Sequence, residues 1–156
     1  MKKIAILGKL QTKYKAPFDD SDWQIWSMNL HADAKFIPRV DKWFDLHKKP
    51  DNINADYLKN NFDFDACRRL VGGNYFNNTV SFMIAFAILQ GATHINLYGM
   101  RFECDHERRH GEYQNVRELV FFARGRGIIV EAPFDEIMLK DLPIYSDTDS
   151  RDFDLY

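Results

Sequence analysis

An apolar helix that leads directly into a strand is the strongest structural signal in this chain. Residues 77–90 open with the polar Asn77-Asn78-Thr79 and continue with apolar side chains on nearly every face, which predicts a buried central helix that stops at Gly91. Residues 93–98 then predict a strand. A helix followed at once by a strand is typical of the βαβ unit, so the sequence predicts an α/β fold.

The other predicted strands fit a parallel sheet. Residues 3–7 form a nearly continuous apolar run that ends at a glycine, as expected of a central strand buried on both faces. Bulky apolar residues before polar loops predict strands at 23–28 and 42–46, and a strand at 128–131 follows a helix predicted over 112–123. We therefore expect a Rossmann-like, three-layer α/β domain with a mostly parallel sheet.

The middle and the end of the chain complete the predicted domain. The spacing of apolar residues predicts a short helix over 51–61, a further strand at 68–71 and a helical stretch at 137–140. A chain of 156 residues leaves no room for a second independent domain, so we expect a single domain over residues 1–145, followed by an acidic tail at 146–156.

Composition limits the classes of function open to this chain. It has 156 residues, of which 46% are hydrophobic, enough for one domain with one core. The formal net charge of −2 provides no field that would hold duplex nucleic acid. The longest apolar stretch, Val80 to Leu89, is far shorter than the roughly 20 residues that a membrane span requires. We expect neither duplex nucleic acid nor a membrane as a partner.

Cysteine and aromatic usage narrows the setting further. Cys67 and Cys104 form no CxxC pair and no segment resembles a signal peptide, so we expect a reducing compartment, the cytoplasm. The aromatic content of 15% includes Trp23, Trp26 and Trp43, which fit either a filled core or a stacking surface. We favour the core, since large aromatic residues usually serve burial.

Ligands of open parallel sheets bind beyond the carboxyl ends of the strands, where helix N-termini also point their amides outward. The predicted strands and helices therefore select the candidate site residues by position. These are Gly8, Lys9, Asn29, His47, Asn74, Asn78, Thr79, Gly99, Arg101 and Glu103.

The loops after the first two strands suggest how a nucleotide would be held. Gly8 permits a close backbone approach and Lys9 can neutralise phosphate, but the loop has neither a GxGxxG nor a P-loop pattern. Gly8 also fits an ordinary glycine at the end of a strand. Asn29 has donor and acceptor atoms suited to a base or a ribose, and it equally fits a turn asparagine.

The start of the central helix has two interpretations that do not exclude each other. Asn78 and Thr79 could present amides and a hydroxyl to an anion at the positive end of the helix dipole, or they could cap the helix. Farther along, Arg101 and Glu103 place opposite charges at the cleft, where they bind substrate or pair with each other.

A polar loop after residue 103 contains candidates for chemistry. Cys104, His106 and His110 are types that bind zinc, but their spacing matches no established site and a fourth ligand is missing, so no metal is predicted. His106 or His110 could act as a general base or acid, because imidazole exchanges protons readily and this loop can fold over the cleft. Of the two, His106 is the predicted catalytic residue. A solvated polar loop is the alternative.

Several segments resemble a group of small bacteriophage proteins of unassigned function. They are residues 16–20 with 23–26, Pro38-Arg-Val-Asp-Lys-Trp-Phe-Asp-Leu-His47, and Ala123-Arg-Gly-Arg-Gly-Ile128, and the resemblance covers most of the chain. It implies a phage-encoded protein in the host cytoplasm.

The order of features more distantly resembles the bacterial CMP-sialic-acid-dependent sialyltransferases and the related motility-accessory and pterin-pyrophosphokinase-like family. That resemblance implies that Gly8, Asn29, and Asn78 with Thr79 surround a nucleotide. The Asn96-Leu-Tyr-Gly99 segment resembles their Gly-hydrophobic-Asp turn, with Arg101 where the acid is expected.

Three hypotheses follow. The first is a phage protein that binds a nucleotide or a nucleotide sugar. If this protein is catalytic, the hypothesis makes it a small glycosyl- or nucleotidyl-type transferase with His106 as the base. The alternative is a non-catalytic binder that sequesters a nucleotide signal or blocks a host protein. The third is an interaction module whose surface is made by Tyr14, Phe18 and Tyr75. No cofactor is assigned. A second copy of the chain is one candidate partner, because domains of this kind commonly pair, and a host protein is another.

Overall fold

The computed structural model describes residues 1–29, 34–100 and 107–134, with only the backbone described at 107–110. In these residues the strands form a six-stranded parallel sheet of order β4-β3-β2-β1-β5-β6. The strands are β1 (Lys3–Leu7), β2 (Trp23–Met28), β3 (Lys42–Asp45), β4 (Tyr57–Leu58), β5 (His94–Tyr98) and β6 (Ile129–Glu131). The strands predicted at 3–7, 23–28, 42–46, 93–98 and 128–131 are confirmed, with small shifts at their ends.

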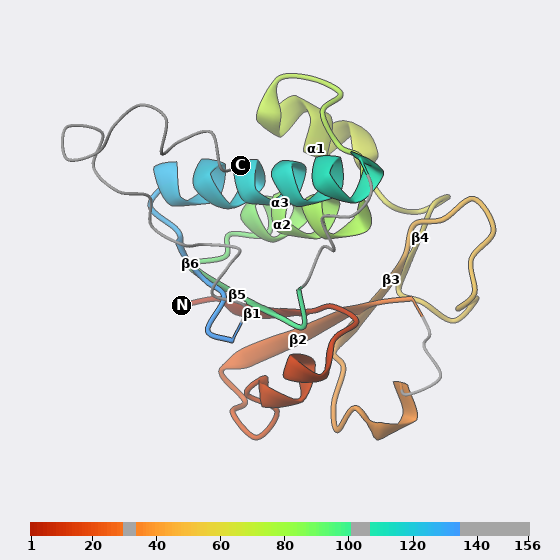
Figure 1. Ribbon diagram of the computed structural model, residues 1–156, viewed down its shortest axis with the longest axis vertical. Helices are drawn as coiled ribbons and strands as arrows, with labels where there is room; N and C mark the ends of the chain where they lie inside the picture. Colours follow the sequence, from red (N-terminus) through yellow and green to blue (C-terminus); the bar gives the residue numbers. More distant parts are fainter. Residues whose placement is uncertain (30–33, 101–106, 135–156) are drawn as a thin grey trace.

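Helices cover one face of the sheet and 3₁₀ turns cover the other (Figure 1). The helical layer contains α1 (Phe64–Val71), α2 (Thr79–Leu89) and α3 (Glu107–Gly125), and the opposite layer contains η1 (Gln11–Lys15) and η2 (Ala34–Phe36). The connections from β1 through β2 and β3 to β4 run toward one edge of the sheet, and those from β4 to β5 and β6 run toward the other edge. Because crossovers between parallel strands are right-handed, the two groups of connecting segments lie on opposite faces of the sheet. The predicted three-layer, Rossmann-like α/β fold is confirmed.

β1 lies at the centre because it is apolar on both faces. Ile4 and Ile6 join the core beneath the helices, whereas Ala5 and Leu7 join a smaller cluster on the other face, and all four are fully buried. Phe18, a candidate for a protein-binding surface, packs against this smaller cluster. Of the other two candidates, Tyr14 is partly buried and Tyr75 is exposed.

α2 is the central helix that the apolar segment predicts. It lies between α1 and α3 over β1, which explains why it is apolar all round. Met83, Ile84 and Ala85 are fully buried in this position. The chain leaves the helix through Gly91, whose φ of 76° is in the left-handed region.

The aromatic residues serve mainly the core, as predicted. Trp26 is 1% exposed, and its ring centroid lies 5.2 Å from that of Phe44 and 5.7 Å from that of Phe86. Trp23 is partly buried and packs against the smaller cluster, where Lys3 Nζ lies 5.8 Å from its ring centroid.

The helix predicted over 51–61 is wrong. Tyr57–Leu58 instead forms β4, the edge strand, which pairs with β3 through Phe44 and Tyr57. The following turn is closed by Asn61, whose Oδ1 accepts the Leu58 amide at 2.6 Å and whose Nδ2 donates to the Asp56 carbonyl at 3.0 Å. Side-chain hydrogen bonds therefore replace the helical bonds that the apolar spacing suggested.

The strand predicted at 68–71 is also wrong, because these residues belong to α1. Asp63 caps this helix by accepting the Ala66 amide at 2.8 Å, and Gly72 ends it with a φ of 81°. The helix buries Cys67 against α2 and leaves its polar side chains outside. The predicted helix over 112–123 begins earlier, at Glu107. The helical stretch predicted at 137–140 and the tail at 146–156 lie outside the described residues.

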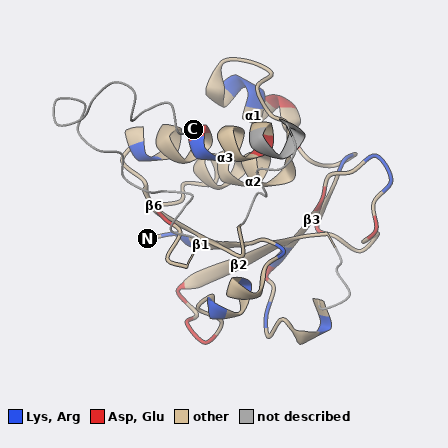
Figure 2. Ribbon diagram, viewed as in Figure 1, with Lys and Arg blue, Asp and Glu red and all other residues tan. Residues whose placement is uncertain are grey.

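Lys and Arg residues and Asp and Glu residues are spread over the described segments, whereas α2, β2 and β5 carry none (Figure 2). Among the helices of the described residues, none combines the length and apolar character needed to cross a membrane.

Candidate functional site

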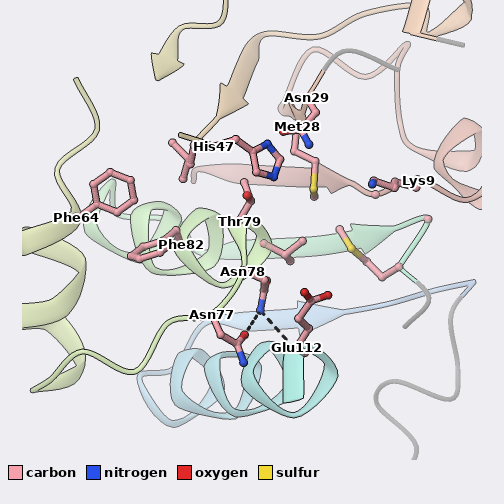
Figure 3. Close-up of a pocket in the computed structure, with 15 residues that line it drawn as sticks. Lys9, Met28, Asn29, His47, Phe64, Asn77, Asn78, Thr79, Phe82 and Glu112 are labelled. Carbon is pink, nitrogen blue, oxygen red and sulfur yellow. Dashed lines mark hydrogen bonds between the residues drawn. The ribbon is translucent and has the colours of Figure 1, made fainter. Parts of the chain in front are cut away.

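A pocket of about 440 Å³ opens where the strands end (Figure 3). It lies at the carboxyl ends of β1, β2, β3 and β5 and at the first turn of α2. The strand order of the sheet reverses between β1 and β5, and ligands of such sheets bind at this switch point. Its size is in the range of small-molecule sites. It is lined by Gly8, Lys9, Met28, Asn29, Leu46, His47, Phe64, Asn77, Asn78, Thr79, Val80, Phe82, Gly99, Met100 and Glu112.

Most of the residues selected by position from the sequence meet in this pocket. The ones that line it are Gly8, Lys9, Asn29, His47, Asn78, Thr79 and Gly99. Asn74 does not: it is exposed and accepts a hydrogen bond from Arg68 Nε at 3.1 Å. Arg101, Glu103 and His106 lie outside the described residues.

Gly8 and Gly99 fold the first loop against the end of β5. The Gly8 amide donates to the Tyr98 carbonyl at 2.7 Å, and Gly99 exchanges bonds with the loop, accepting from the Leu10 amide at 3.1 Å and donating to Thr12 Oγ1 at 3.1 Å. A β-carbon on Gly8 would stand 2.3 Å from the Gly99 carbonyl oxygen. Close packing alone therefore requires glycine at position 8.

Asn29 combines an unusual backbone with an unusual side chain. Its φ of 50° makes it the one non-glycine residue with positive φ among those described, a conformation that asparagine tolerates better than most residues. It is 7% exposed, and its buried Oδ1 has no hydrogen-bond partner in the described part of the chain. Leaving a buried amide unsatisfied costs about 1–3 kcal/mol, so this group is a candidate for ligand contact.

The first turn of α2 is built by Asn78. Its Oδ1 accepts the Ser81 amide at 3.0 Å, and its Nδ2 donates to Ser81 Oγ at 2.9 Å and Asn77 Oδ1 at 2.8 Å. The capping interpretation thus accounts for the Asn78 side chain. The amides of Thr79 and Val80 precede the first intrahelical bonds, and both residues line the pocket.

Asn115 of α3 holds the segment before this helix in place. It is 2% exposed, its Nδ2 donates to the Tyr75 carbonyl at 3.0 Å, and its Oδ1 accepts the Asn77 amide at 3.2 Å. The sequence indicated only a helical polar residue here, because these contacts span residues far apart in the chain.

Asp45 positions His47 at the end of β3. The Asp45 carboxylate is fully buried, and its Oδ2 accepts the amides of Asp51 at 2.7 Å and Asn52 at 2.9 Å. Its Oδ1 lies 3.0 Å from Nδ1 of His47, whose side chain is 53% exposed and points into the pocket (Figure 3). Asp45 was not among the site residues predicted from the sequence, although an Asp-x-His spacing at the end of a strand was a signal for it.

One end of the pocket is aromatic. Phe64 and Phe82 line it, with ring centroids 4.9 Å apart in an edge-to-face arrangement. Figure 3 shows these rings at the opposite end from Lys9. Neither phenylalanine was predicted from the sequence, since both belong to the helical layer and not to strand ends.

Glu112 of α3 is the acidic side chain of this lining, and its backbone carbonyl accepts a hydrogen bond from Asn78 Nδ2 at 3.4 Å. Glu112 was not predicted as a site residue from the sequence. In the described residues, no group of three or more histidine, cysteine, aspartate or glutamate side chains is arranged to hold a metal ion. Of the loop considered for zinc, Cys104 and His106 lie outside those residues.

Comparison with protein-family models, with curated proteins and with solved structures finds no match to this chain.

Proposed function

We propose that this protein binds a nucleotide or a nucleotide sugar in the pocket at the carboxyl ends of its strands. The observation that carries the proposal is Asn29, whose buried Oδ1 has no hydrogen-bond partner among the described residues and which lines a cavity that also contains a helix N-terminus. A polar ligand that bonds to Asn29 recovers the cost of burying that group.

The polar end of the pocket suits phosphate. The amides of Thr79 and Val80 are free of intrahelical partners, and the first turn of α2 carries no acidic residue to oppose an anion. Lys9 is exposed at the same pocket and adds a positive charge. Glu112 disfavours an anion beside α3, so we place the phosphate toward Lys9.

The aromatic end suits a base. Phe76 stacks on one face of Phe82, with ring centroids 4.2 Å apart, but Phe64 and Phe82 are only partly buried. The exposed parts of these rings can contact a base, and stacking is worth about 1–3 kcal/mol per base in nucleic-acid complexes. Asn29 supplies one acceptor and two donors to a sugar hydroxyl or to the edge of the base. The pocket thus offers a site for each part of a nucleotide.

A thermal-shift screen against nucleoside mono-, di- and triphosphates, cyclic nucleotides, UDP-glucose, GDP-mannose and CMP-sialic acid tests this function. A ligand at 100 times its dissociation constant stabilises the fold by about 2.7 kcal/mol, or roughly 5–10 °C for a domain of this size. We expect at least one of these compounds to produce such a shift, and the Lys9→Ala variant to reduce it.

Asn74→Ala is the matched control, because Asn74 is an exposed asparagine that does not line the pocket. Its shift should equal that of the unmodified chain. A melting temperature that no compound changes would contradict the proposed function. Stabilisation by a cyclic nucleotide alone would favour the sequestering binder over the transferase.

A further inference from the structure

The pocket contains a histidine that is oriented by a buried carboxylate. Asp45 is fully buried, and the amides of Asp51 and Asn52 fix one of its oxygens. The other oxygen lies 3.0 Å from Nδ1 of His47. Because an ionised carboxylate can only accept, this contact places the ring proton of neutral His47 on Nδ1.

The tautomer determines what His47 offers to a ligand. With the proton on Nδ1, the lone pair lies on Nε2, the ring nitrogen that Asp45 does not contact. His47 lines the same pocket as Thr79 and Lys9, so its free nitrogen and the proposed phosphate site share one cavity. A side chain held in this way loses little freedom when it accepts a proton from a bound hydroxyl.

We propose that His47 is the general base of a reaction in which a hydroxyl displaces the nucleotide from a bound nucleotide sugar, with Asp45 as its positioning residue. This inference rests on the proposed function. It assigns the base to a histidine of the pocket, whereas the sequence pointed to His106.

The step balances with a hydroxyl compound as co-reactant, either water or an acceptor sugar. His47 Nε2 takes the hydroxyl proton while the oxygen forms a bond to the anomeric carbon of the sugar. The bond from that carbon to the phosphate oxygen breaks, and the nucleotide leaves with the electron pair. The amides of Thr79 and Val80, together with Lys9, stabilise the charge that develops on the phosphate. The imidazolium then releases its proton to solvent.

The experiment follows nucleotide release from UDP-glucose, GDP-mannose and CMP-sialic acid by anion-exchange chromatography, with water alone and with glucose or glycerol as acceptor. We expect the full chain to consume at least one of them. His47→Ala should lower the rate at least 100-fold, in the range of general-base catalysis, with the dissociation constant of the released nucleotide unchanged. Free imidazole should restore part of the lost rate, which a merely structural role of His47 would not allow.

His94→Ala is the matched control. His94 is the first residue of β5, at the amino-terminal end of the strand and away from the pocket, and its Nδ1 lies 3.0 Å from Thr93 Oγ1. The His94→Ala variant should therefore leave the rate unchanged. Asp45→Asn should lower kcat without a matching rise in KM. If Asp45→Asn does not fold, the two histidine variants and the imidazole rescue decide the question.

Two results would overturn the inference. One is a His47→Ala variant with the unmodified rate. The other is a chain that binds a nucleotide sugar yet leaves it intact under all conditions, which would retain the proposed binding and remove the catalysis. If none of the nucleotides or nucleotide sugars binds, the proposed function itself fails, and this inference fails with it.

Discussion

The backbones of Gly8 and Gly99 lie so close together that a β-carbon on Gly8 would stand 2.3 Å from the Gly99 carbonyl oxygen. This approach joins the ends of β1 and β5 and folds the first loop beside the pocket. The floor of the candidate site therefore depends on a contact that only glycine permits.

Gly8→Ala should destabilise the fold by at least 1–3 kcal/mol, about the cost of overpacking, because the obstructing atoms are backbone and cannot rotate away. Urea denaturation measures this loss. Gly125→Ala is the control, since an added β-carbon there meets nothing within 4 Å and alanine favours a helix, so its stability should be equal or slightly greater. Equal stability of the two variants would contradict the close approach.

Asn29→Gly should weaken nucleotide binding roughly 3–10-fold, the value of one ordinary hydrogen bond. Glycine accepts the φ of 50° without strain, so the variant removes the amide and keeps the backbone. Because the lost Oδ1 is unpartnered in the described residues, the free energy of unfolding should stay the same or rise. Isothermal titration calorimetry and urea denaturation give the two quantities. Unchanged affinity would remove Asn29 from the site.

Asn78→Asp separates capping from anion binding. Aspartate caps helices about as well as asparagine and retains the acceptor for the Ser81 amide, but it adds a negative charge at the pocket. We expect phosphate-containing ligands to bind more weakly in the Asp variant than in Asn78→Ala, although the Ala variant loses the cap and should be the less stable of the two. Tighter nucleotide binding to Asn78→Asp would contradict an anion site at this helix.

Cys67 should be unreactive in the folded protein. Burial, together with the Asp63 carboxylate, raises the pKa of the Cys67 thiol from 9.0 to about 12. Thiolate is the reactive form, so in a Cys104→Ser background the thiol should react with Ellman's reagent at pH 8 only after unfolding in urea. Rapid labelling of the folded chain would contradict its burial.

The same shift makes stability depend on pH. The folded state holds the Cys67 proton more tightly than the unfolded chain does, so this contribution is complete below about pH 9 and declines as the pH rises toward 12. The decline is about 1.4 kcal/mol per pH unit for one group. It should be absent in Cys67→Ala, and an identical pH dependence in both chains would contradict the shift.

The sequence predicted the parts of the fold that rest on local patterns. The run at 3–7 and the helix before Gly91 are apolar on nearly all sides because most of their side chains lie in the core. The strand expected at 68–71 was wrong because the Asp63 cap and the Gly72 turn decide that α1 forms there, and both lie outside the four-residue pattern.

The candidate site divides in the same way. Residues that directly follow a strand, such as Asn29 and His47, could be selected from the chain order, since parallel strands end at one edge. Phe82 and Glu112 could not, because they lie within helices and reach the pocket only through tertiary packing. Asp45 was missed because its role is to hold another residue.

The central claim is that a nucleotide binds at the carboxyl ends of the strands, and mapping backbone amide shifts by NMR tests it most directly. The ligand that stabilises the fold most would be titrated into ¹⁵N-labelled protein. We predict the largest changes at Lys9, Asn29, Thr79 and Val80, with little change at the second cavity beside α3, which Gly73 and Phe122 line. Changes concentrated at that second cavity, or spread without a focus over the described residues, would contradict the claim.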